Sequence, residues 1–341
     1  TRRLLRRREY LVFSEVIMKR VLLALFCVAV AFTASAASNE VVVYTAHEES
    51  IINALVPMFE KDTGIKVNYV KLASGDVIKR AKAEANNPQA DVIWSIGGEQ
   101  LEAENQILQA YTPRDWDKIV SVYKVGTNWL PYTGIMNVFV VNTKMLKPEQ
   151  YPQSWTDLQD ARFKKLVSSA PADKSGSAYM QLANVIAIYG EKGWDIYKGI
   201  MKNMVISTSS GAVPKFVNDG EQAVGLTLED NAFRFVEGGG PVAIVYPKDG
   251  TVAAPDGMAI LKGAPNLANA KVFTDWCLSK PVQEYLVKEM KRRPVRTDVA
   301  SPKGLPAMTE VKSIPYDFGW AASNKTAFVK KFTDIKMDLG L

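Results

Sequence analysis

The sequence predicts an α/β protein with doubly wound, parallel-sheet units, and three observations carry this prediction. Short runs rich in Val and Ile alternate with helical patterns along the chain, which is typical of βαβ units. Three of the early runs end in a small polar or glycine turn that opens a helix, after Tyr44, Leu72 and Trp94. The 305 residues after Ala36 are enough for a large core, and chains of this length usually divide into two domains.

The first hundred residues supply the clearest elements. Residues 40–44 (EVVVY) form a β-branched run that predicts a buried strand. A helix follows, with apolar residues from Ile51 to Phe59 on one face and Gly64 as its end. A second strand is predicted over 65–72, a charged helix over 77–86 and a third strand over 90–94.

The middle of the chain centres on residues 205–230, VISTSSGAVPKFVNDGEQAVGLTLED. This stretch predicts a strand, the hydroxyl-rich turn Thr208–Gly211, a short helix, and a second strand that stops at Glu229 and Asp230. In parallel sheets ligands bind beyond the carboxyl ends of strands, and both polar clusters fall at such ends. The alternative is that these residues only cap helices.

The flanking segments continue the pattern. Residues 127–141 hold Pro131, Gly134 and a strand-like run that could carry the chain from one domain into the other. Further strands are predicted over 166–169, 242–246 and 252–261, and a long helix runs through residues 180–189. Helices over 268–278, 282–291 and 324–335 follow, with residues 292–296 as a loop.

The sequence pattern at the N-terminal end predicts that the protein is exported. Met18, Lys19 and Arg20 precede an apolar run over 21–32, and residues 34–36 (Ala-Ser-Ala) match a cleavage site. Residues 18–36 are therefore predicted to be a signal peptide, cleaved after Ala36 to leave a soluble periplasmic protein. Residues 1–17 are interpreted as an artefact of start-site choice. Phe26 before Cys27 does not fit a lipoprotein signal.

Charge and residue counts exclude several classes. The chain has 42 Lys and Arg against 36 Asp and Glu, and residues 1–36 hold seven of these bases and two of these acids. The remainder is close to neutral, at 35 against 34, so nucleic acid is not a predicted partner. After residue 36 only His47 and Cys277 remain of their types, too few for a site of several His or Cys ligands. We predict no cofactor, no bound metal and a buried core thiol at Cys277.

Five stretches carry a resemblance to a known family. They are residues 41–67 (VVVYTAHEESIINALVPMFEKDTGIKV), 90–98 (ADVIWSIGG), 138–146 (VFVVNTKML), 205–230, and 245–286, which starts VYPKDGTVAAPDGMAI. Over residues 38–335 the chain resembles type II periplasmic solute-binding proteins of ABC importers. The resemblance implies two α/β lobes joined by crossing hinge strands, with a ligand in the cleft and hinge closure. Lobe 1 would hold 38–137 and 252–341, and lobe 2 would hold 138–251. It also implies a monomer that delivers its ligand to an inner-membrane permease.

Within this family the chain is most similar to the ferric-iron-binding branch. That branch uses two consecutive tyrosines after the strand that here ends at Leu228, where this chain has Glu229 and Asp230. His47 lies near a position where iron binders use a histidine, so ferric iron stays an alternative. The branch also contains carriers of sugar phosphates and phosphonates.

The candidate ligand-binding residues are hydroxyl, glycine, histidine and carboxylate positions at predicted strand ends. Helix starts offer free N–H groups and partial positive charge, which suits phosphate, and Lys174 or Lys215 could add charge. Glu229 and Asp230 would accept from hydroxyls or an ammonium at the other end of the ligand. We therefore expect an organic phosphate, either a sugar phosphate or a phosphonate. For each Ser or Thr the alternative is simple capping, and for His47 it is a structural hydrogen bond. The set is Thr45, His47, Ser74, Gly75, Ser95, Ser175, Gly176, Ser177, Thr208, Ser209, Ser210, Gly211, Glu229 and Asp230.

Two other functional classes fit less well. A hydrolase could use His47 with Glu48, or Glu229 with Asp230, as acid and base, but the sequence has no nucleophile elbow, P-loop or metal-ligand spacing. We therefore predict no enzyme. A surface adhesin or sensor partner would need a large exposed apolar patch, which a sequence does not reveal.

Overall fold

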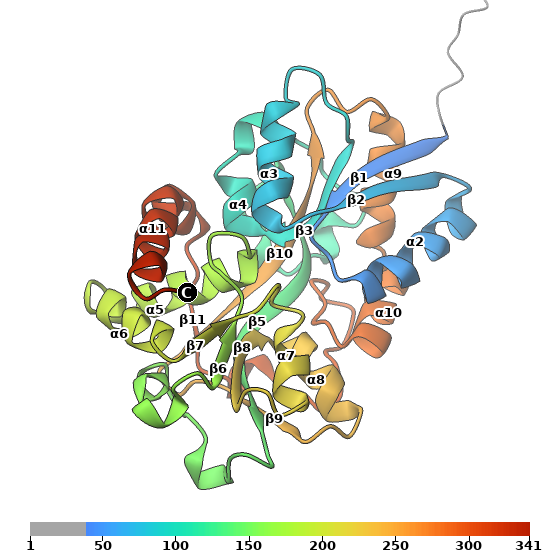
Figure 1. Ribbon diagram of the computed structural model, residues 1–341. Helices are drawn as coiled ribbons and strands as arrows, with labels where there is room; N and C mark the ends of the chain where they lie inside the picture. The colour runs from blue at the N-terminus through green and yellow to red at the C-terminus, as the bar shows by residue number, and fades with distance from the viewer. Residues whose placement is uncertain (1–38) are drawn as a thin grey trace, which may run out of the picture. The chain divides into compact units, whose positions relative to one another are not determined.

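One mixed sheet of eleven strands organises residues 39–341, the part of the chain that the computed structural model describes (Figure 1). The main strand order is β2-β1-β3-β10-β5-β8-β6-β7, with β4 and β11 (Ser313–Ile314) paired to β10 and β9 paired to β5. The predicted signal peptide, its cleavage after Ala36 and the predicted start-site artefact lie outside the described residues.

The first half of the sheet is built as the sequence predicts. Strand β1 (Glu40–Thr45) lies between β2 (Lys66–Lys71) and β3 (Val92–Gly97), parallel to both. The connecting helices are α2 (Glu49–Thr63) and α3 (Ser74–Ala83), and α4 (Gly98–Glu102) follows β3. The short β4 (Leu108–Gln109) pairs with β10 (Thr251–Leu261). Helix α2 ends at Gly64, whose φ of 71° is left-handed and whose N–H donates to Glu60 O.

The second half repeats this scheme. Strand β6 (Val167–Ser169) lies between β7 (Met204–Ile206) and β8 (Val224–Leu228), parallel to both. Helices α5 (Gly176–Tyr189), α6 (Lys192–Met201) and α7 (Val213–Asn218) connect these strands. Helix α8 (Glu229–Glu237) leads to β9 (Val242–Val245).

Two long antiparallel strands join the halves. Strand β5 (Leu130–Asn142) pairs with β10 through residues 130–136 and with β8 and β9 through residues 137–142. All thirteen residues of β5 are buried. The structure thus confirms the predicted α/β fold of two doubly wound halves joined by crossing strands.

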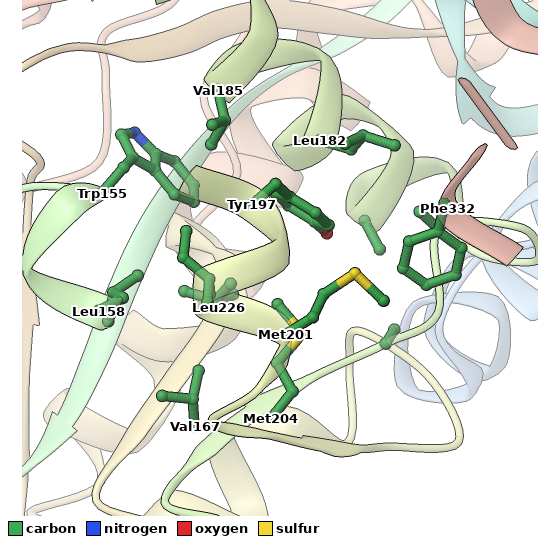
Figure 2. Packing of buried hydrophobic residues seen from close by; sticks show 14 of the residues in the cluster. Trp155, Leu158, Val167, Leu182, Val185, Tyr197, Met201, Met204, Leu226 and Phe332 are labelled. Carbon is green, nitrogen blue, oxygen red and sulfur yellow. The ribbon is translucent and has the colours of Figure 1, made fainter. Parts of the chain in front are cut away.

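The largest apolar cluster lies on the second half of the sheet (Figure 2). Trp155 is buried there, its ring 4.9 Å from that of Phe139 at a steep angle, and its Nε1 donates to Gly250 O at 3.0 Å. Phe332 of the C-terminal helix α11 (Phe318–Asp338) packs into the same cluster near Tyr197. Burial of large side chains dominates the stability of such a core.

A second cluster lies on the first half of the sheet. It includes α9 (Leu267–Cys277) and α10 (Lys280–Met290), and Cys277 is a fully buried free thiol, as predicted. Burial raises the pKa of this thiol well above its usual value, so it is a poor nucleophile.

Several elements differ from the sequence prediction, and three helices among them illustrate why. Helix α6 was not expected, because Gly193 and Gly199 interrupt its apolar pattern. Helix α11 begins at Phe318, six residues before the predicted start, with the Asp317 side chain accepting from Trp320 N–H. Helix α4 occupies part of a predicted loop. Within residues 39–341, no helix combines the length and apolarity needed to span a membrane.

Candidate functional site

A cavity of about 410 Å³ lies where the two halves of the sheet meet. The first half contributes residues 46–48, 71–74, 95–97 and Glu99. The second half contributes Pro171, residues 174–177, Met180, residues 208–211, Leu228 and Asn231. Ile135, Asp256 and Arg292 complete the lining, the first two from the crossing strands β5 and β10.

Ten of the fourteen candidate residues line this cavity. They come from five separate segments, which the fold brings together at strand ends and helix starts. The ten are His47, Ser74, Ser95, Ser175, Gly176, Ser177, Thr208, Ser209, Ser210 and Gly211.

Two of the remaining four candidate residues lie next to the cavity wall. Thr45 Oγ1 donates to Trp94 O at 2.8 Å and accepts from His47 N–H at 3.0 Å, so its side chain shapes the turn before α2. The N–H of Gly75 lies 3.5 Å from Lys174 O, across the junction of the two halves.

The structure does not place Glu229 and Asp230 in the lining, contrary to the sequence interpretation. Glu229 accepts two hydrogen bonds from Arg293, at 2.7 and 2.9 Å, and one from Tyr246 Oη at 2.7 Å. Asp230 lies 3.1 Å from Arg292. Arginines distant in sequence therefore occupy both carboxylates. Lys215 also lies elsewhere, paired with Asp219 on α7.

The start of α5 forms one wall of the cavity. The Ser175 side chain caps this helix by accepting from Ala178 N–H at 3.3 Å. Gly176 and Ser177 form its first turn, where backbone N–H groups lack intrahelical acceptors. A Cβ on Gly176 would come within 2.6 Å of Gln100 Nε2 on α4, so a larger residue there would require the Gln100 side chain to move.

The loop at 208–211 faces this helix start. Ser210 Oγ lies 3.3 Å from Ser177 Oγ, which joins the two segments directly. Thr227 Oγ1 donates to Ser210 O at 3.0 Å, and Ser209 Oγ accepts from Ala212 N–H at 3.2 Å. The hydroxyls of two segments therefore converge on one region of the cavity.

His47 is a buried neutral donor. Its Nδ1 accepts from Glu48 N–H at 3.2 Å, which leaves the proton on Nε2. Burial, and then the charge of Arg292, hold the pKa of His47 well below its usual value. Its Nε2 has no hydrogen-bond partner among residues 39–341. The ring packs edge-on against Trp94 and Tyr132, with centroids 4.9 and 5.6 Å away.

Arg292 is a lining residue that the sequence analysis missed. It is 4% exposed and lies 3.0 Å from Asp256 and 3.1 Å from Asp230, and its Nη1 donates to Thr133 Oγ1 at 2.7 Å. Asp256 also accepts from Ser95 Oγ at 2.6 Å. Burial raises the pKa of Asp256, while Arg292 opposes that rise. The sequence signal that could have identified Arg292 is the group of three arginines within residues 292–296.

Within residues 39–341, no group of three or more His, Cys, Asp or Glu side chains is arranged to hold a metal ion.

The family model described as bacterial extracellular solute-binding protein matches residues 87–319. The chain belongs to this family. A Haemophilus influenzae protein of uncharacterized function is 32% identical to this solute-binding protein over 330 residues, covering 91% of this chain and 94% of that one. A Salmonella typhimurium protein with the name putative 2-aminoethylphosphonate-binding periplasmic protein is 29% identical over 250 residues, covering 71% and 73%. The iron uptake protein A1 of Synechocystis is 25% identical over 294 residues, covering 81% of each chain.

A solved structure shares the fold closely. The periplasmic binding protein AfuA of Actinobacillus pleuropneumoniae, with fructose-6-phosphate bound, has a TM-score of 0.82 and 29% identity to this solute-binding protein. The match covers 86% of this chain and 98% of AfuA.

Proposed function

We propose that this chain is the periplasmic substrate-binding protein of an ABC importer and that its cavity takes an organic phosphate or phosphonate. The observation that carries the proposal is the hydroxyl-lined start of α5. Ser175, Gly176 and Ser177 there meet Ser209 and Ser210 of the facing loop at the cavity wall.

This wall suits an anion for physical reasons. A helix start combines N–H donors with partial positive charge, and serine hydroxyls add further donors. Lys174, one residue before the cap of α5, adds a formal charge at the cavity. Charge-assisted hydrogen bonds of this kind are worth about 1.5–3 kcal/mol each.

The size of the cavity favours an organic ligand over inorganic phosphate. A phosphate ion has only a few times the volume of a water molecule, which occupies about 30 Å³ in the liquid, so bare phosphate would leave most of the 410 Å³ to solvent. One relative is named a putative 2-aminoethylphosphonate-binding protein, and another was solved with fructose-6-phosphate bound. Both support the same ligand class.

Ferric iron is the second candidate, because one relative is an iron uptake protein. Two observations weaken it. The chain has Glu229 and Asp230 where the iron-binding branch has two tyrosines, and both carboxylates are paired with arginines.

The crossing strands β5 and β10 support a hinge between two lobes. We propose that residues 38–137 with 252–341 form one lobe, that 138–251 form the other, and that they close over the ligand about β5 and β10. The chain would act as a monomer without catalytic turnover, bind no nucleic acid, be cleaved after Ala36 and pass its ligand to an inner-membrane permease. N-terminal sequencing of exported protein should then start at Ala37.

Calorimetric titration tests the ligand class. We expect glucose 6-phosphate or 2-aminoethylphosphonate to bind, and inorganic phosphate to bind more weakly because it fills less of the cavity. Ser209→Ala should weaken the ester or phosphonate about tenfold, since it removes one hydroxyl donor to the anion. Ser121→Ala, outside the cavity, is the matched control.

Small-angle scattering on the same samples tests closure, because a ligand that bridges the lobes should reduce the radius of gyration. Binding of ferric citrate alone, with no phosphate ester or phosphonate bound, would restore the iron-carrier alternative and reject the proposal.

A further inference from the structure

Glu99 of α4 is a buried carboxylate on the cavity wall. It is 1% exposed and lines the cavity, and its Oε1 has no hydrogen-bond partner among the described residues. The carboxylate folds back over Gly97, where an added Cβ would lie 2.7 Å from Oε2. A buried carboxylate with unused acceptor capacity is costly unless something else satisfies it.

The protein groups around Glu99 offset its charge only in part. Lys325 of α11, Tyr179 of α5 and Tyr316 interact with Glu99 electrostatically, and none of the three makes an ion pair or hydrogen bond with it in the described part of the chain. Tyr179 Oη donates instead to Ala321 O, at 2.5 Å. Burial raises the pKa of Glu99 more than Lys325, the backbone and Gln100 lower it.

Some of the charged side chains that line the cavity have an ion-pair partner within the described part of the protein, and others do not. Six charged side chains line it, and four are paired within the protein: Glu48 with Arg234, Lys71 with Glu49, and Asp256 with Arg292. In residues 39–341 only Lys174 and Glu99 lack an ion-pair partner among these six. One is a cation beside the start of α5, and the other is an acid on the opposite half of the sheet.

A ligand with one anionic and one cationic group would complement both. Resting on the proposed function, we propose that Glu99 binds the ammonium group of a zwitterionic aminoalkyl phosphonate or phosphate whose anionic end lies at α5. The ammonium would supply the hydrogen bonds and opposite charge that Glu99 lacks inside the protein.

A pair of isosteric ligands isolates this contact. Propylphosphonate carries a methyl group where 2-aminoethylphosphonate carries its ammonium, so the ratio of their dissociation constants measures the ammonium contact. In the wild-type protein we expect 2-aminoethylphosphonate to bind about tenfold or more tightly. Glu99→Gln should reduce this preference to less than about threefold, because 2-aminoethylphosphonate loses its carboxylate partner.

Two further variants serve as controls. Glu102→Gln changes an acid on the same helix that does not line the cavity and that accepts from Trp129 Nε1 at 2.9 Å, so the preference should persist. Glu99→Asp keeps the carboxylate and should keep a preference for the amine, which separates loss of charge from loss of structure.

The pH dependence provides an independent readout. Glu99 must give up its proton to bind an ammonium, and burial raises its pKa, so affinity for the amine should increase as pH rises through that raised value. The ammonium lowers the second pKa of its own phosphonate, so the two ligands ionise at different pH, and the same titration of Glu99→Gln supplies the baseline. The ratio of the affinity for the amine to that for propylphosphonate should rise more steeply with pH in the wild type than in Glu99→Gln, and equal slopes in the two proteins would contradict the role of Glu99.

Equal affinity of the wild type for the two phosphonates would overturn the role of Glu99 and leave the phosphonate site standing. So would an amine preference that survives in Glu99→Gln. Failure of every phosphonate and phosphate ester to bind would instead remove the proposed function on which this role rests.

Discussion

Replacing Arg292 by alanine is expected to lower the free energy of unfolding by about 3–5 kcal/mol at neutral pH. Arg292 is buried between Asp230 and Asp256, 3.1 and 3.0 Å away, and its removal leaves two buried carboxylates without their cation. Chemical denaturation measures the change. Arg162→Ala, which removes an exposed arginine 3.5 Å from Asp160, should cost less than about 1 kcal/mol.

The loss should depend on pH in a defined direction. Burial already raises the pKa of Asp256, and without Arg292 this pKa rises further above the unfolded value of about 3.9. A carboxyl with a raised folded pKa destabilises the protein increasingly as pH rises above the unfolded pKa. The difference between variant and wild type should therefore be largest at neutral pH and shrink toward pH 4. A loss of equal size at both pH values would contradict this account.

Ser177→Asp should reduce affinity for the organic phosphate at least about a hundredfold. The new carboxylate would lie in the first turn of α5, where we place the ligand anion. Two like charges about 4 Å apart repel by about 4 kcal/mol at an effective dielectric constant of 20. Isothermal titration with the best ligand from the panel gives the change.

The same substitution should not weaken the fold. An acidic residue near a helix N-terminus typically stabilises the helix by about 0.3–1 kcal/mol. Thermal unfolding of Ser177→Asp should therefore match or exceed the wild type. Ser177→Asn is the neutral control and should lose far less affinity. Retained affinity in Ser177→Asp would show that the anion binds elsewhere.

The strands and most helices were predictable because their signals are local. β-branched runs such as residues 40–44 and glycine ends such as Gly64 depend on a few neighbouring residues. Helix α6 was missed because Gly193 and Gly199 disturb its pattern, and tertiary packing of Trp194 and Tyr197 maintains it. Local sequence patterns therefore predict elements with strong local signals better than elements that distant contacts stabilise.

The residues of the candidate site were also predictable only where their sequence signals are local. The hydroxyl and glycine positions were found because they follow predicted strands, and their position relative to the sheet follows from the topology. The roles of Glu229 and Asp230 depended on Arg292 and Arg293, more than sixty residues further along the chain. No local pattern connects these groups, so the sequence suggested free carboxylates where the structure has ion pairs.

Strand β5 has a consequence for how this protein loses its structure. Its thirteen buried residues complete both halves of the sheet, because its first part pairs with β10 and its second with β8 and β9. Neither half can unravel without exposing part of a strand that the other half needs. The two-lobed protein should therefore melt in one cooperative transition, with calorimetric and van't Hoff enthalpies in agreement, and its slowest-exchanging amides should lie in β5.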